Sequence, residues 1–352
     1  MAKRARVSEP DESDRIEGFP HPRATTRLIG HDVALSRAAR AIRGGRPPQG
    51  WLISGPPGIG KATLAYRIAR YLLTCGARDT GLEDLSVPAN DPGAIQVAAG
   101  SHPGLLVLKR GINEKTGKLM SELPVNEVRR LAGFFGMTSG AGGWRVAIVD
   151  TADDMNANAA NAILKLLEEP PSRAMLILIA NRPGQLLPTI RSRCQRLELR
   201  PLDDDVVAGA LKRFLPDAGA EERTALARLS GGAIGAALEL ASGEGRELAA
   251  EAGRLIDQAA TPDVIALLAL GDRLSRMRDG LPRFSEFLIE SLSARIRAKA
   301  RQAGAHMERW TALLTHLEDH FARSRGLNLE PRQTILGAAR DMAATARRAG
   351  AL

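Results

Sequence analysis

A glycine-rich segment that ends in a lysine gives the strongest chemical signal in this chain. From Gly55 to Lys61 the residues follow the pattern G-x-x-x-x-G-K, in which backbone N–H groups surround phosphate oxygens and the ammonium contacts the β and γ phosphates. The pattern usually continues with a hydroxyl that binds Mg²⁺, but this chain has Ala62 there. Thr63 cannot replace that hydroxyl, because one step along a helix turns the side chain by about 100°. The spacing predicts a phosphate-binding loop without one ligand of the metal.

A second candidate feature is a carboxylate at the end of an apolar segment. Residues 146–149 are all apolar and predict a buried strand that ends at Asp150. In a P-loop enzyme this aspartate would hold the Mg²⁺. Many such ATPases continue with a glutamate that polarises the attacking water, whereas Thr151 has no basic group near neutral pH. Asp153 and Asp154 lie beyond the strand, on a turn before the next helix, and we expect no catalytic role for them.

Strands that alternate with helices are needed to position these residues. The expected strands are residues 51–54, 146–149, 175–180 and 195–199. The expected helices are residues 61–73 and a segment that Asn156 caps and that Pro170 and Pro171 end. Alternation of this kind indicates an α/β fold, with a parallel sheet covered by helices on both faces.

Composition and charge limit the class of protein further. A chain of 352 residues is long enough for two or three domains, and its 44% hydrophobic content is typical of a folded globular protein. No apolar stretch is long enough to span a membrane, and the N-terminus lacks the apolar run of a secretory signal, so we expect a cytoplasmic protein. The net charge of +9 suggests nucleic-acid binding, but the basic residues are spread along the chain. The densest basic run, residues 295–301, is interpreted as a solvated helix surface.

The cysteines and histidines do not indicate a metal site. Cys75 and Cys194 are too few for a tetrahedral structural zinc site, and a disulfide between them is not expected in a cytosolic chain. His316 and His320 are one helical turn apart, which could suit a metal. They lack the glutamate of H-E-x-x-H and a third ligand, so we interpret them as surface histidines.

Two longer motifs are more specific than the P-loop alone. Residues 158–171 contain a run of small residues followed by Leu-Glu-Glu-Pro-Pro, and residues 190–194 read Ile-Arg-Ser-Arg-Cys. Together they resemble the clamp-loader branch of the AAA+ ATPases, strongly over residues 20–200 and loosely over the rest. The resemblance implies an AAA+ P-loop core with a parallel sheet, a small helical lid and a C-terminal all-helical collar that joins subunits into a ring.

The resemblance also places the domain boundaries. We expect a flexible tail at residues 1–17, a RecA-like AAA+ core at 18–199, a helical lid at 200–242 and a helical collar at 243–352. Within the collar, the expected helices are residues 249–259, 262–278, 283–302, 307–325 and 330–348. An insertion from Lys109 to Leu123 is polar and contains glycine, and it predicts an exposed loop or hairpin without an assigned role.

Three residues acquire roles from the resemblance. Arg193, in the Ser-Arg-Cys motif, would be an arginine finger that reaches the γ-phosphate bound by a neighbouring ATPase subunit, since a guanidinium offers planar, permanently charged donors. The alternative is that it pairs with a local carboxylate. Asn181 falls where the family has a polar residue that senses the γ-phosphate. Gly235 falls where the lid often carries a nucleotide-sensing arginine.

The losses at Ala62, Thr151 and Gly235 predict that the chain does not hydrolyse nucleotide. No cofactor is required, although ATP or ADP could remain bound without hydrolysis. The candidate nucleotide-binding residues are Gly55, Gly58, Gly60, Lys61, Thr63, Asp150 and Asn181. Relatives often carry a four-cysteine zinc module after the P-loop helix. Cys75 lies where its first ligand would be, but residues 76–107 contain no further cysteine, so we expect no zinc.

Three functions are compatible with these features. The first is a non-hydrolysing subunit of the loader that helps to load the sliding clamp on primed DNA during replication and supplies an arginine finger. It would be a component of a DNA polymerase holoenzyme without ATPase activity of its own. Its implied partners are the ATPase (gamma/tau) and delta subunits of the loader, the sliding clamp and primer–template DNA, with no membrane. The alternatives are an active AAA+ ATPase motor subunit and a plain DNA-binding protein.

Overall fold

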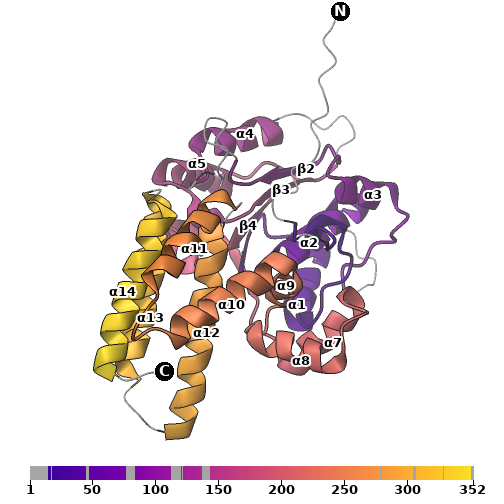
Figure 1. Cartoon of the computed structure of the whole chain (residues 1–352). Helices are drawn as coiled ribbons and strands as arrows, with labels where there is room; N and C mark the ends of the chain where they lie inside the picture. The colour runs from indigo at the N-terminus through magenta and orange to yellow at the C-terminus, as the bar shows by residue number, and fades with distance from the viewer. Residues whose placement is uncertain are drawn as a thin grey trace, which may run out of the picture. The chain divides into compact units, whose positions relative to one another are not determined.

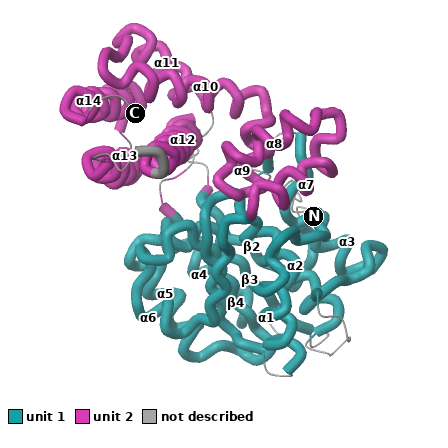
Figure 2. The backbone as a smooth tube through the Cα atoms, turned by 90° about the horizontal axis from the view of Figure 1, so that it is seen from below, with its two compact units in different colours: residues 1–110, 123–202 teal, residues 111–122, 203–352 magenta. Residues whose placement is uncertain are grey.

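The computed structural model describes residues 15–16, 18–44, 47–76, 84–111, 120, 122–136, 143–277, 280–303, 307–327 and 329–349 (Figure 1). They divide into two compact units (Figure 2). Unit 1 comprises residues 1–110 and 123–202, and unit 2 comprises residues 111–122 and 203–352. The segments predicted as lid and collar fall in unit 2, except for residues 200–202, which belong to unit 1. The tail predicted at residues 1–17 and the loop predicted at residues 109–123 lie mostly outside the described residues.

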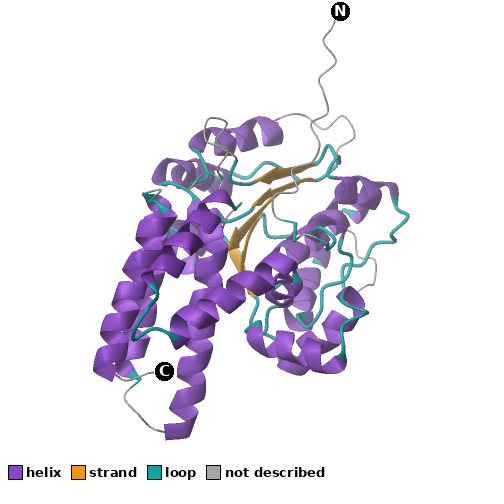
Figure 3. Cartoon of the chain, viewed as in Figure 1, coloured by secondary structure: helices purple, strands orange, loops and turns teal. Residues whose placement is uncertain are grey.

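Unit 1 is built on a five-stranded sheet in the order β2-β3-β4-β1-β5, with every neighbouring pair parallel. Strands of this sheet are drawn in orange in Figure 3. The strands are β1 (Gly50–Ser54), β2 (Leu105–Leu108), β3 (Arg145–Val149), β4 (Ala174–Ala180) and β5 (Gln195–Glu198). The central strands β1 and β4 are buried at every residue, which explains why they appear in the sequence as continuous apolar runs. The α/β fold with a parallel sheet, expected from the AAA+ resemblance, is confirmed.

Helices cover this sheet on both faces. In chain order they are α1 (Asp32–Arg43), α2 (Lys61–Cys75), α3 (Pro92–Ala99), α4 (Val125–Gly136), α5 (Ala157–Glu168) and α6 (Pro188–Arg193). One face packs Leu52, Leu176 and Leu178 against apolar residues of α4, α5 and α6. The alternate residues of β1 and β4 point to the other face, where α2 packs.

Local sequence signals explain most of these boundaries. Asn156 caps α5 as predicted, because its side chain accepts a hydrogen bond from the Ala159 N–H at 2.9 Å. The helix then ends before Pro170 and Pro171, where the sequence indicated. Strand β2 was not predicted: it has only four residues and lies at the sheet edge, so it offers little periodic signal.

Every named element of unit 2 in the described residues is a helix: α7 (Asp204–Phe214), α8 (Ala220–Leu229), α9 (Ile234–Ala241), α10 (Gly243–Asp257), α11 (Val264–Arg276), α12 (Gly280–Ala303), α13 (Glu308–Gly326) and α14 (Pro331–Ala349). The last five share one apolar core that includes Leu248, Phe284 and Trp310.

The start predicted for α10 at residue 249 is wrong. Ser242 caps the helix instead, accepting a hydrogen bond from the Gly245 N–H at 3.1 Å, so the helix begins at Gly243.

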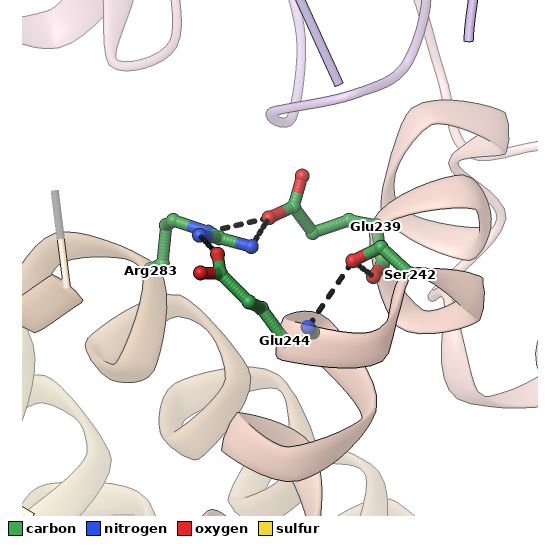
Figure 4. A network of polar contacts seen from close by, with 5 residues as sticks. Glu239, Ser242, Glu244 and Arg283 are labelled. Carbon is green, nitrogen blue, oxygen red and sulfur yellow. Dashed lines mark hydrogen bonds and ion pairs between the residues drawn. The ribbon is translucent and has the colours of Figure 1, made fainter. Parts of the chain in front are cut away.

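An arginine of α12 joins α9 to α10 within unit 2 (Figure 4). The Arg283 guanidinium lies 2.5 Å from a carboxylate oxygen of Glu239 in α9 and 2.7 Å from one of Glu244 in α10. Ser242, between these two helices, also donates its hydroxyl to the Glu239 carbonyl at 2.6 Å. Two residues therefore hold the bend between α9 and α10: Ser242, which lies within it, and Arg283, which reaches it from α12.

The basic run of α12 carries ion pairs on the surface of unit 2. Arg295 pairs with Asp257, and Arg297 pairs with Glu290 at 2.9 Å. Such pairing is typical of a solvated helix face, as interpreted from the sequence. The two histidines also have protein partners: His316 lies 3.0 Å from the Asp341 carboxylate, and His320 lies 2.9 Å from the Thr334 carbonyl. His320 is half-buried rather than fully on the surface.

Candidate functional site

The glycine loop connects the end of β1 to the first turn of α2, as the sequence predicted. Gly55, Gly58 and Gly60 all have positive φ angles, of 149°, 72° and 109°. At Gly55 a Cβ atom would lie 2.4 Å from the Leu199 carbonyl oxygen, so no other residue fits there without moving the backbone. The loop thus has the tight backbone of a phosphate cradle, followed by the positive end of a helix.

Lys61 is held at this loop by hydrogen bonds. It is the first residue of α2 and is only 6% exposed. Its ammonium donates to the carbonyls of Gly55 at 2.8 Å and Pro56 at 2.6 Å. These two carbonyls hold the buried ammonium at the loop. Phosphate oxygens could replace them as acceptors of its hydrogen bonds.

The two residues after Lys61 do not complete a metal site. Ala62 and Thr63 are the second and third residues of α2 and are half-buried. Ala62 has no oxygen to offer, and Thr63 is rotated by about 100° around the helix from that position. The residues therefore fit a phosphate group better than they fit a phosphate with its Mg²⁺.

The other predicted candidates lie at the same edge of the sheet. All neighbouring strands are parallel, and Ser54 pairs with Ala180, so Gly55 and Asn181 leave the sheet at the same level. Asp150 follows β3, on the far side of β4, and its N–H donates to the Leu108 carbonyl at 2.9 Å. The sheet order thus brings the loop, Asp150 and Asn181 to one edge, where ligands of open α/β sheets bind.

Thr151 occupies a backbone conformation that β-branched residues rarely adopt. Its φ is +56° and its ψ is +55°, in the left-handed region. Its hydroxyl donates to the Asp150 carbonyl at 2.7 Å. The position that would carry a water-polarising glutamate therefore holds a hydroxyl engaged with its own backbone.

Asp153 has a structural role that sequence reasoning missed. Its carboxylate accepts hydrogen bonds from the backbone N–H groups of Asn181, at 3.1 and 3.2 Å, and of Arg182, at 2.9 Å. It thereby fixes the tip of β4 that presents Asn181. Asp154 instead pairs with Arg110 at 3.3 Å. Asp153 lies 28 residues from Asn181, so no local spacing could have indicated the contact.

A buried histidine just before α1, also missed, supports the loop. His31 is 7% exposed, and its Nε2 lies 2.9 Å from the Ile59 carbonyl, which requires the tautomer with a proton on Nε2. Burial lowers the pKa of His31, although the Ile59 carbonyl and Asp32 partly oppose this shift. Burial therefore favours the neutral imidazole, which donates to the backbone just before Gly60.

Arg193 ends α6 in an exposed ion pair. Its Nη2 lies 2.9 Å from Oε1 of Glu168, the last residue of α5, and its Nη1 donates to the Thr189 carbonyl at 3.1 Å. A local carboxylate, the alternative considered from the sequence, is thus present. The Arg193 side chain remains 38% exposed, so the pairing does not bury it.

The remaining sequence candidates are placed as follows. Gly235 lies in the first turn of α9, in unit 2, and has no side chain to offer a nucleotide. Cys75 ends α2 and is half-buried, while Cys194 is buried, which raises the pKa of its thiol to about 12. Among the described residues, no group of three or more His, Cys, Asp and Glu side chains could hold a metal ion. In the same part of the chain, no helix is long and apolar enough to cross a membrane.

Comparison with known proteins gives a consistent family. A family model described as DNA polymerase III, delta subunit matches residues 30–203. The DNA polymerase III subunit delta' of Pseudomonas aeruginosa is 40% identical over 184 residues, which are 52% of this chain and 52% of that protein. The subunit delta' of Escherichia coli is 32% identical over 213 residues, 60% of this chain and 59% of that protein.

A second kind of relative matches over more of the chain at lower identity. The DNA polymerase III subunit tau of Escherichia coli is 26% identical over 324 residues, which are 92% of this chain and 46% of that protein. The matches thus span about half the length of these relatives. Residues 30–203, which the family model matches, contain the P-loop, Asp150 and the Ser-Arg-Cys motif. Over residues 30–203 the chain therefore matches this family, and it is similar there to the delta' subunits of DNA polymerase III.

Proposed function

We propose that this chain is a non-hydrolysing delta-prime subunit that helps a DNA polymerase III clamp loader to place the sliding clamp on primed DNA. Its partners would be the ATPase (gamma/tau) and delta subunits of a hetero-oligomer and, through that complex, the clamp and primer–template DNA. The relatives support this role, because their names place them among the subunits of DNA polymerase III.

The main support for a chain without ATPase activity is that the phosphate cradle is well formed, whereas the groups needed for hydrolysis are missing. The glycine loop and Lys61 offer donors for phosphate oxygens. Ala62 offers no metal ligand, and the Thr151 hydroxyl is occupied by the Asp150 carbonyl. ATP or ADP would therefore bind without being hydrolysed, since binding needs only the cradle while hydrolysis also needs Mg²⁺ and an oriented water.

Arg193 is the residue through which the chain would act on its neighbour. A guanidinium supplied in trans stabilises the charge that develops on the γ-phosphate, and a finger of this kind contributes about 10³- to 10⁵-fold to turnover in other NTPases. Arg193 suits this role because it ends a short helix and is exposed. Charge supplied in trans would couple assembly to hydrolysis, since a subunit without its neighbour would lack the arginine.

The test is ATP turnover by a loader reconstituted with Arg193→Ala. We expect the activity of the adjoining ATPase site to fall about 10³-fold or more. The total ATP turnover of the loader should then fall by at least the fraction that this site contributes. Arg129→Ala, which removes an exposed arginine of α4, is the charge-matched control. Native gel filtration would check that both variants still assemble. Equal turnover of the two variants would exclude the finger role.

Nucleotide hydrolysis by the purified chain would instead favour the motor-subunit alternative. The chain should bind ATP or ADP, measured by titration calorimetry, and produce no phosphate with Mg²⁺ present.

Tight DNA binding by the isolated chain that weakens steeply with salt would favour the DNA-binding alternative. We expect no zinc in the purified protein, which elemental analysis would test.

A further inference from the structure

The ends of α5 and α6 meet at one tightly packed point beside the start of β1. Gly50 lies close to both helix ends: a Cβ there would lie 2.6 Å from Leu167 Cδ2 and 3.4 Å from both the Arg193 carbonyl oxygen and Cys194 Sγ. Cys194 is itself buried. The backbone that carries Arg193, and the residue just before Glu168, are therefore anchored by packing.

The side chain of Arg193 is oriented by two contacts beyond this anchor. Nη2 pairs with Glu168 Oε1 at 2.9 Å, and Nη1 donates to the Thr189 carbonyl at 3.1 Å. A guanidinium has five N–H donors, so these two contacts leave three for another acceptor. The ion pair therefore restrains the direction of the side chain without exhausting its donors.

The position of Glu168 is poorly explained by stability. It is the last residue of α5, where the helix dipole disfavours a negative charge. The ion pair is exposed, at 38% for Arg193 and 50% for Glu168, and exposed pairs contribute little to folding. The carboxylate nevertheless contacts one of the two terminal nitrogens of the guanidinium, which points to a role in directing that group.

We propose that Glu168 is a positioning residue that keeps the Arg193 guanidinium directed outward before the neighbouring subunit arrives. This proposal rests on the proposed role of Arg193 as a finger. A free arginine side chain loses much rotamer freedom when a phosphate fixes it, and a side chain already held in place loses less. Glu168 thereby increases the fraction of loaders in which the finger is correctly placed.

The experiment compares Glu168→Gln with Glu169→Gln in the reconstituted loader. Glu169 is the adjacent exposed carboxylate at the same helix end, so its variant controls for the lost charge. We expect Glu168→Gln to lower kcat about two- to fivefold, the effect expected for an exposed ion pair. The KM for ATP and the thermal midpoint of the isolated chain should stay unchanged, and Glu169→Gln should match the wild type.

A double-mutant cycle distinguishes positioning from a general structural effect. In an Arg193→Ala background, Glu168→Gln should cause no further loss, because the group that it positions is gone. An equal loss in both backgrounds would overturn the proposal, as would a Glu168→Gln loader that matches or exceeds the Glu169→Gln loader. Faster ATP turnover by the Glu168→Gln loader would mean that the ion pair with Glu168 keeps the Arg193 guanidinium away from the neighbouring site. Full activity of Arg193→Ala alone would instead refute the finger role itself.

Discussion

Replacing Arg283 by methionine is expected to destabilise unit 2 by about 2 kcal/mol, because it leaves two carboxylates without their partner. Arg283 and Glu239 are mostly buried, at 23% and 24% exposed, whereas Glu244 is 57% exposed. A mostly buried carboxylate without its partner costs about 1–3 kcal/mol, and an exposed pair contributes about 0.2–1 kcal/mol. Methionine keeps the apolar stem of the side chain, so the packing of that stem is largely retained.

Urea denaturation followed by circular dichroism measures this difference on the intact chain. Arg246→Met is the matched control, since Arg246 also lies in unit 2 and its pair with Glu222, at 3.3 Å, is exposed. We expect the control to lose less than about 1 kcal/mol. Glu244→Gln should resemble the control, and Glu239→Gln should fall between the control and Arg283→Met. The reasoning is refuted if Arg283→Met is no less stable than Arg246→Met.

Three further predictions concern unit 1. Ala62→Thr should not restore ATP hydrolysis to the isolated chain in a phosphate-release assay, because Thr151 still provides no water-polarising carboxylate; measurable turnover would contradict this. Asn156→Ala should lower the free energy of unfolding by about 1 kcal/mol, since the cap of α5 is lost, and an unchanged urea midpoint would count against that cap. Stability should also fall as the pH drops below about 6.5, because burial lowers the pKa of His31 and the unfolded chain then binds more protons. His31→Gln should remove part of this slope in pH-dependent melting, but not all of it, because burial also lowers the pKa of His102.

The sequence predicted the features that depend on neighbouring residues. The glycine loop, the first strand and the following helix lie within residues 50–75, and their order and spacing are local. The central strands are buried on both faces, so their apolar runs were easily recognised. The cap at Asn156 follows from a short side chain just before a periodic apolar segment.

The features that the sequence did not predict depend on contacts between distant segments. The Asp153 carboxylate and the Asn181 backbone, and the His31 imidazole and the Ile59 carbonyl, are brought together only by the packed fold. Arg283 likewise meets Glu239 across 44 positions of the chain. For Arg193 the sequence allowed a local carboxylate but could not identify Glu168, because β4 separates α5 from α6 in the chain and only the packed fold brings the two helices together. The start of α10 was missed for a local reason, since glycines at its first turn conceal the Ser242 cap.

The most direct test of the central claim compares Lys61→Ala with Arg193→Ala in the same reconstituted loader. The first substitution disables the cradle of this chain, and the second removes the arginine offered to its neighbour. If the chain does not hydrolyse nucleotide and acts in trans, ATP turnover survives Lys61→Ala and falls with Arg193→Ala. Loss of turnover with Lys61→Ala and full turnover with Arg193→Ala would contradict the claim, because the chain would then be using its own site.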